Sequence, residues 1–160
     1  MTFIKMCGMT REDDVRAACA LGVDAVGFVM WPESPRYVDA ARVAALVQVL
    51  PPAVLPVAVM VAPTADDLRE VRDAGVRTVQ VHTVGAPTVA LPSAEALGSL
   101  DLWVATSLER HVEAMVPGVR LVLDAHDPVR HGGTGRTIDW AAAAAVAARR
   151  QILLAGGLTP

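Results

Sequence analysis

Short apolar runs alternate with longer amphipathic runs along the chain. The apolar runs predict strands, and the amphipathic runs predict helices with one buried face. The expected strands are 3–7, 24–30, 55–61, 76–82, 102–106, 119–124 and 151–155, and the expected helices are 11–21, 39–50, 64–74, 93–97, 107–115 and 139–150. Strands that alternate with helices are typical of an α/β protein with a parallel sheet and right-handed crossovers.

Polar residues and glycines mark the ends of several predicted helices. Thr10 is expected to cap the first helix and Thr64 the third, because a hydroxyl can accept a hydrogen bond from the first turn. Gly22 and Gly75 follow these helices and are expected to end them.

Seven strand–helix units follow one another without a linker or a change of composition, which favours a (βα)8 barrel over an open sheet. We expect residues 1–160 to form a single barrel domain. A closed barrel needs eight strands, so the last helix–strand–helix portion is expected to be missing, leaving unpaired edges on the first and seventh strands. A fragment of a longer protein is the simpler interpretation, and a shortened barrel completed by another chain is the alternative.

Composition and charge exclude several classes of protein. The hydrophobic fraction of 53% argues against disorder, and a net charge of -3 without a basic stripe argues against a nucleic-acid or membrane-surface partner. No apolar run approaches about 20 residues, the length of a membrane span. The two cysteines, Cys7 and Cys19, lack zinc spacing, and no signal peptide is recognisable. We therefore expect a cytoplasmic protein without a disulfide framework or a metal.

The active site of such a barrel lies at the carboxyl ends of the strands, where Cys7 ends the first strand. Strand alternation places Lys5 and Cys7 on one face, and Ile4 and Met6 on the other. If Ile4 and Met6 pack on helices, Cys7 points to the barrel mouth, where its thiolate could act as a base if positive charge lies nearby. The alternative is a small buried apolar residue.

Asp124 ends the sixth strand and is the candidate acid. An aspartate at this point could instead cap the next turn. Asp127 and Asp139 are better placed for capping, which leaves Asp124 available for chemistry.

Two glycine-rich loops follow neighbouring strands and predict a phosphate site, although each could be an ordinary flexible loop. Glycines let backbone N–H groups approach a phosphate closely, and barrels of this kind often bind phosphate in their last loops. The glycines concerned are Gly132, Gly133 and Gly135 after the sixth strand and Gly156 and Gly157 after the seventh.

Three further polar residues lie near predicted strand ends. Gln80 and His82 share a face of the fourth strand, where His82 could carry a proton, donate a hydrogen bond or only fill a polar position. Arg36, after the second strand, could hold a ligand carboxylate with its guanidinium fork, or form a surface ion pair.

Five segments, in this order, resemble the phosphoribosylanthranilate isomerase family. Lys5-Met6-Cys7-Gly8-Met9-Thr10-Arg11 is similar to its first-strand signature, usually Lys-Ile-Cys-Gly-Ile-Thr-Arg. The other four are Gly27-Phe28-Val29 with Ser34-Pro35-Arg36-Tyr37-Val38, Val79-Gln80-Val81-His82, Leu123-Asp124 with Gly132-Gly133-Thr134-Gly135 and Asp139-Trp140, and Leu154-Ala155-Gly156-Gly157-Leu158-Thr159-Pro160.

The resemblance implies an enzyme of tryptophan biosynthesis that needs no cofactor and acts on a small-molecule substrate. It would convert N-(5-phosphoribosyl)anthranilate to 1-(2-carboxyphenylamino)-1-deoxyribulose 5-phosphate, an Amadori rearrangement catalysed by an aldose–ketose isomerase. Asp124 would be the acid, Cys7 the base and Arg36 the ligand of the anthranilate carboxylate. Gln80 and His82 would contact the substrate, and the glycines would line its phosphate end. The resemblance leaves open whether the protein is a monomer or a homodimer.

Two departures from the family pattern leave alternatives open. Thr83-Val84-Gly85 follows His82, where the family usually has Gly and soon a Glu, and the Ser-Gly phosphate loop of the eighth strand is missing. Another barrel enzyme that acts on a phosphorylated sugar is one alternative, such as indole-glycerol-phosphate synthase or a histidine-pathway isomerase. A truncated and inactive barrel fragment is the other.

Overall fold

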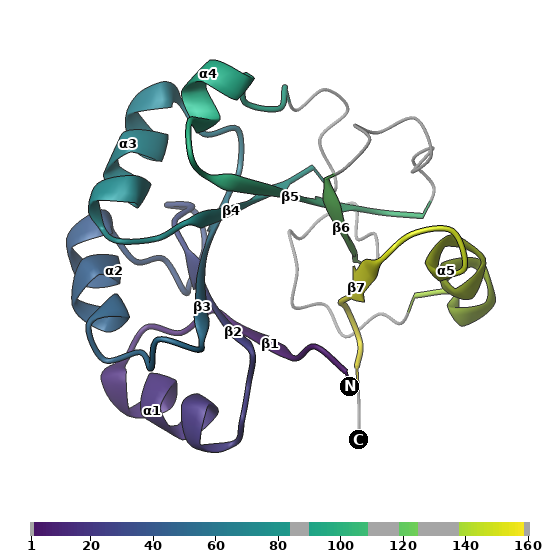
Figure 1. Cartoon of the computed structure of the whole chain (residues 1–160), viewed down its shortest axis with the longest axis horizontal. Coiled ribbons are helices and arrows are strands. Elements are labelled where there is room, and N and C mark those ends of the chain that lie inside the picture. Colours follow the sequence, from purple (N-terminus) through teal and green to yellow (C-terminus); the bar gives the residue numbers. More distant parts are fainter. Residues whose placement is uncertain (1, 84–89, 109–118, 125–137, 159–160) are drawn as a thin grey trace. The chain divides into compact units, whose positions relative to one another are not determined.

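The computed structural model describes residues 2–83, 90–108, 119–124 and 138–158. Within these ranges the chain is an α/β protein whose seven strands follow one another in the sheet in chain order (Figure 1). The strand pairs whose register is described are all parallel. The predicted α/β class with a parallel sheet is therefore confirmed, while closure as a (βα)8 barrel stays a prediction.

The chain divides into two compact units. The first consists of Met1–Val81 and Leu91–Leu102, and the second of His82–Ala90 and Trp103–Pro160. Strands β4 (Thr78–His82) and β5 (Asp101–Thr106) each contribute residues to both units.

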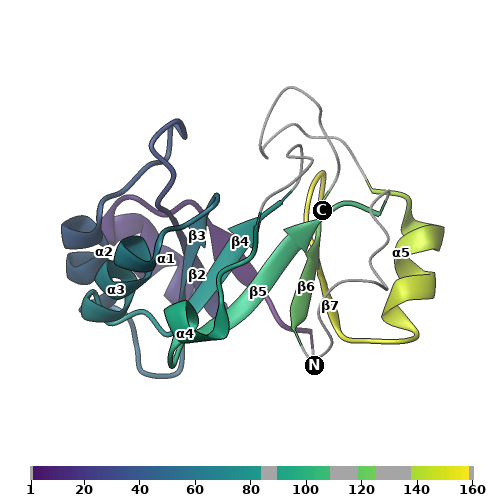
Figure 2. The same ribbon diagram turned by 90° about the horizontal axis from the view of Figure 1, so that it is seen from above.

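The first unit contains three complete strand–helix pairs. Helices α1, α2 and α3 lie on one face of its strands, as two perpendicular views show (Figures 1 and 2). Besides its parts of β4 and β5, the unit comprises β1 (Lys5–Cys7), α1 (Glu12–Ala20), β2 (Ala25–Val29), α2 (Ala40–Val47), β3 (Leu55–Met60), α3 (Ala65–Asp73) and α4 (Ala94–Leu97).

Each of these three helices buries one pair of apolar residues three positions apart, the spacing that places two side chains on one helical face. The pairs are buried together with strand residues such as Phe28, which has no exposed surface. Burying one such side chain contributes about 1.5–3 kcal/mol. The helix pairs are Val15 with Ala18, Val43 with Leu46, and Leu68 with Val71.

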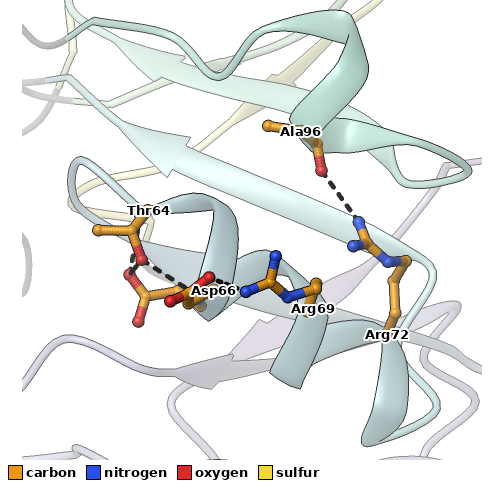
Figure 3. Close-up of polar contacts among 6 residues, drawn as sticks. Thr64, Asp66, Arg69, Arg72 and Ala96 are labelled. Carbon is orange, nitrogen blue, oxygen red and sulfur yellow. Dashed lines mark hydrogen bonds and ion pairs between the residues drawn. The ribbon is translucent and has the colours of Figure 1, made fainter.

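The start of α3 confirms the predicted cap at Thr64. The Thr64 hydroxyl accepts a hydrogen bond from the Asp67 N–H at 3.2 Å, and the Asp67 carboxylate accepts one from the Thr64 N–H at 2.7 Å (Figure 3). Arg72, near the end of the helix, donates to the carbonyl of Ala96 at 3.0 Å and so ties α3 to α4. Figure 3 also shows the ion pair between Asp66 and Arg69 on the same helix.

The predicted cap at Thr10 is wrong. The residue that precedes α1 is Arg11, and its side chain makes no capping hydrogen bond. The first turn instead carries three acidic residues, Glu12, Asp13 and Asp14, whose charge stabilises the positive end of the helix dipole.

The second unit contains β6 (Arg120–Leu123), α5 (Trp140–Ala147) and β7 (Ile152–Leu154), besides the ends of β4 and β5. Asp139 caps α5, since its carboxylate accepts hydrogen bonds from the N–H groups of Ala141 and Ala142 at 2.9 and 3.1 Å. Most of the helix predicted at 107–115 lies outside the described residues. No helix in the described ranges is both long enough and apolar enough to cross a membrane.

Candidate active site

The candidate residues within the described ranges lie at the carboxyl ends of strands. Cys7 is the last residue of β1, Gln80 and His82 lie in the last three residues of β4, and Asp124 directly follows β6. In parallel α/β proteins this edge of the sheet is where ligands bind. Cys7, Arg36 and Gln80 belong to the first unit, and His82 and Asp124 to the second.

Cys7 is a free, exposed cysteine held by main-chain contacts between β1 and β2. Directly after it, the N–H groups of Gly8 and Met9 both donate to the Gly27 carbonyl, at 2.8 and 3.1 Å. These bonds fix the turn that carries Cys7. Because the residue is exposed, the alternative of a small buried apolar residue is wrong.

Ile4 and Met6, expected on the other face of the first strand, are not buried. Their side chains are 49% and 39% exposed. Strand β1 stands first in the strand order and pairs only with β2 among the described strands, so it lacks the neighbour that would help to cover these residues.

Arg36 lies directly against the turn after Cys7. Its Nη1 donates to the Cys7 carbonyl at 3.2 Å. Gly8 has a φ of +88°, and a Cβ at this position would lie 2.6 Å from Arg36 Nη1, so both the backbone conformation and the close approach require glycine. Among the described residues, Arg36 forms no ion pair with a carboxylate. The guanidinium is thus suited to hold a carboxylate from a ligand.

Gln80 contributes a buried hydrogen-bond acceptor. The residue is 5% exposed, and no donor within the described part of the chain reaches its Oε1. Thr78, two residues earlier on the same face of β4, also has a buried hydroxyl without a described partner. Buried polar atoms normally have a partner, which can be an ordered water or a ligand group.

His82 and Asp124 face each other in the second unit. His82 Nε2 lies 3.4 Å from Asp124 Oδ2, and the two side chains are only 10% and 15% exposed. The main chain of Asp124 is fixed as well, because its N–H donates to the Thr106 carbonyl at 3.0 Å. Next to His82, both the N–H and the hydroxyl of Thr83 donate to the Ala105 carbonyl, at 2.9 and 2.8 Å. The carboxylate is therefore anchored by its main chain and by an imidazole.

The glycines predicted to bind phosphate fall into two groups. Gly156 and Gly157 follow β7 with φ values of +82° and +63°, a conformation in which other residues would be strained. Gly132, Gly133 and Gly135 lie outside the described residues. In the ranges that the structure describes, no three His, Cys, Asp or Glu residues gather as metal ligands would.

Three features of the site escaped prediction from the sequence. These are the contact between Arg36 and Gly8, the pairing of His82 with Asp124, and the buried hydroxyl of Thr78. Strand alternation could have indicated Thr78, because it shares a face with Gln80. The two contacts join distant segments and leave no local signal.

Comparison with known proteins gives one consistent family. The sequence model of N-(5'-phosphoribosyl)anthranilate (PRA) isomerase matches residues 4–160. The N-(5'-phosphoribosyl)anthranilate isomerase of Chromohalobacter salexigens is 38% identical over 99% of this chain and 74% of its own length. That of Citrifermentans bemidjiense is 35% identical over 100% of this chain and 78% of its own length.

Solved structures agree with the sequence comparison. The phosphoribosyl anthranilate isomerase of Thermus thermophilus has a TM-score of 0.82 and 32% identity, covering 99% of this chain and 78% of that one. Another such enzyme, in complex with reduced 1-(o-carboxyphenylamino)-1-deoxyribulose 5-phosphate, has a TM-score of 0.77 and 25% identity, covering 99% and 77%. The chain therefore belongs to the phosphoribosylanthranilate isomerase family.

Proposed function

We propose that this chain isomerises N-(5-phosphoribosyl)anthranilate to 1-(2-carboxyphenylamino)-1-deoxyribulose 5-phosphate in tryptophan biosynthesis. The family match over residues 4–160 is the observation that carries the proposal. It also argues against the other phosphosugar barrel enzymes. The strand-end positions of Cys7 and Asp124 support the assignment of the chemistry.

Asp124 is the proposed general acid. Ring opening requires a proton on the ribose ring oxygen, so that the C1–O bond breaks and the anthranilate nitrogen forms an iminium with C1. The contact between Asp124 Oδ2 and His82 Nε2 at 3.4 Å supports this role, because it orients the carboxyl group. General acid catalysis of this kind contributes on the order of 10²–10⁴-fold in rate.

Cys7 is the proposed general base. Its thiolate takes the proton from C2, the electron pair of that C–H bond forms the C1–C2 double bond, and the iminium nitrogen becomes neutral. The resulting enolamine tautomerises to the ketone, so no atoms are gained or lost overall. The exposure of Cys7 beside the guanidinium of Arg36 supports access of substrate to the thiol.

The remaining residues would bind the two ends of the substrate. Arg36 donates one N–H group to the Cys7 carbonyl and would hold the anthranilate carboxylate with its remaining N–H groups. The buried Oε1 of Gln80 would accept a hydrogen bond from the substrate. The loops with Gly132, Gly133, Gly135, Gly156 and Gly157 would bind the phosphate. Positive φ values at Gly156 and Gly157 support a tight loop that presents backbone N–H groups.

Two experiments test the function. Complementation of a tryptophan auxotroph that lacks this enzyme should restore growth, and the purified chain should convert the substrate in a fluorescence assay. Failure of both, with a cooperatively folded protein, would overturn the proposal. An inactive chain is the alternative, and it predicts no cooperative melt and no stabilisation by phosphate or a substrate analogue.

The proposal includes the cellular location of the protein and the class of its substrate. The comparisons join the chain to biosynthetic enzymes, which supports a cytoplasmic location. The ligand of the related crystal structure supports a small-molecule substrate.

A further inference from the structure

We infer that Lys5 is a positioning residue for the proposed base Cys7. Gly27, which has no side chain, leaves the space in which the Lys5 ammonium and the Cys7 thiol lie close together. The inference rests on the proposed function for its catalytic meaning. Its physical part, the interaction between an ammonium and a thiolate, can be tested independently of the reaction.

The register of β1 against β2 sets the geometry. Lys5 is paired with Ala25, and Cys7 with Gly27. Residues paired across parallel strands point to the same face, and residues two apart on one strand also share a face. The side chains of Lys5 and Cys7 therefore lie above the two smallest residues in proteins.

Gly27 is the point at which the two side chains meet. A Cβ on this residue would lie 2.7 Å from Cys7 Sγ and 3.1 Å from Lys5 Nζ. Both atoms are within 3.1 Å of a single point, so the ammonium and the thiol are neighbours. Any side chain at position 27 would displace the thiol, because real Cβ atoms essentially never come that close to another atom.

The positive charge of Lys5 is the property that would act on Cys7. Lys5 is half-buried, and no ion pair with a carboxylate is found for it among the described residues. It is also the only lysine of the 160-residue chain, in which every other Lys or Arg is an arginine. Its charge stabilises the anionic thiolate, which is the form of cysteine that accepts a proton.

The test measures the reactivity of Cys7 directly. Iodoacetamide alkylation of the full chain at neutral pH and low salt is followed by peptide mass spectrometry, which separates Cys7 from Cys19. Lys5→Met should slow alkylation of Cys7 about tenfold, because the positive charge beside the attacking sulfur is lost. Cys19 should react at an unchanged rate, and Lys5→Arg should keep most of the rate at Cys7. Arg16→Met, at an exposed position of α1, removes the same charge elsewhere and should leave the alkylation rate of Cys7 unchanged.

Salt and a double-mutant cycle separate charge from shape. The difference in the alkylation rate of Cys7 between the wild type and Lys5→Met should become smaller at high ionic strength, since salt screens partly exposed charges. Gly27→Ala should also slow alkylation, and Lys5→Met should then have little further effect because the pair is already broken. In turnover, Lys5→Met should lower kcat with little change in KM, and Lys5→Arg should restore much of it.

Two results would overturn the inference. One is equal alkylation of Cys7 in the wild type and in Lys5→Met. The other is a Lys5→Arg variant that reacts as slowly as Lys5→Met, which would show that shape and not charge matters. Failure of the proposed function gives a different result: the wild-type chain would then show no isomerase turnover, while the alkylation rates would still report on Lys5.

Discussion

The two units hold their candidate catalytic groups in different ways. In the first, Cys7 is exposed and placed by main-chain bonds to Gly27, with Arg36 packed against Gly8. In the second, Asp124 is largely buried and faces the side chain of His82. The proposed base is thus positioned by main-chain bonds and close approach, whereas the proposed acid has a side-chain partner in addition to its main-chain bond. Substitutions should therefore affect the two groups differently.

The largest expected effect is at the buried acid. Asp124→Asn should lower kcat by about 10³–10⁴-fold, because an amide cannot supply the proton. Binding of reduced 1-(o-carboxyphenylamino)-1-deoxyribulose 5-phosphate, measured by calorimetry, should largely survive. A comparable loss of binding would make Asp124 a structural residue.

The exposed base should follow. Cys7→Ala should lower kcat by about 10²–10³-fold, since the methyl group cannot accept the C2 proton. The melting temperature should change little, because the side chain is exposed. Cys19→Ala is the matched control and should retain full turnover. Unchanged kcat in Cys7→Ala would remove Cys7 from the mechanism.

Gly8 tests whether backbone geometry positions Arg36 in the first unit. Gly8→Ala should raise KM about tenfold, because the new Cβ would displace the guanidinium of Arg36 and leave the carboxylate of the substrate poorly held. Positive φ should also cost about 1–2 kcal/mol of unfolding free energy. Gly22→Ala has a similar φ of +79° but open space around its Cβ. It should show the stability loss alone, and an equal rise of KM in both variants would contradict the proposed contact.

His82 tests whether a side-chain contact positions the carboxyl group of Asp124. His82→Ala should lower kcat by several-fold to about tenfold, by removing the partner of Asp124. The contact uses Nε2, and a glutamine amide reaches nearly the same point, so His82→Gln should keep more of the activity than His82→Asn. Steady-state kinetics of the three variants decide this. Equal losses in all three would show that the contact does not orient the acid.

The smallest effect concerns the fold alone. Thr64→Ala should cost about 1 kcal/mol of unfolding free energy through loss of the capping box, with unchanged kcat and KM. Thr10→Ala should cost almost nothing, because Thr10 does not cap its helix. Urea unfolding of the two variants checks the difference. Equal destabilisation would contradict the assignment of Arg11 as the first residue before α1.

Local patterns were sufficient for the elements themselves. Apolar runs predicted all seven described strands to within about two residues, because each strand coincides with a short run of mostly apolar residues. Caps were predicted where a side chain bonds to its own helix, as at Thr64 and Asp139. The Thr10 prediction was wrong because a hydroxyl near a helix start does not by itself fix which residue precedes the first turn.

The order of residues was enough to predict the α/β alternation, the family resemblance and the strand-end positions of Cys7, Gln80, His82 and Asp124. It did not predict which side chains meet in the fold: Arg36 with the carbonyl of Cys7 across 29 positions, and His82 with Asp124 across 42. The reason is physical. The type of each element follows from the period of apolar residues within a short stretch of chain, whereas these contacts depend on the strand register and on the space left by residues such as Gly8 and Gly27.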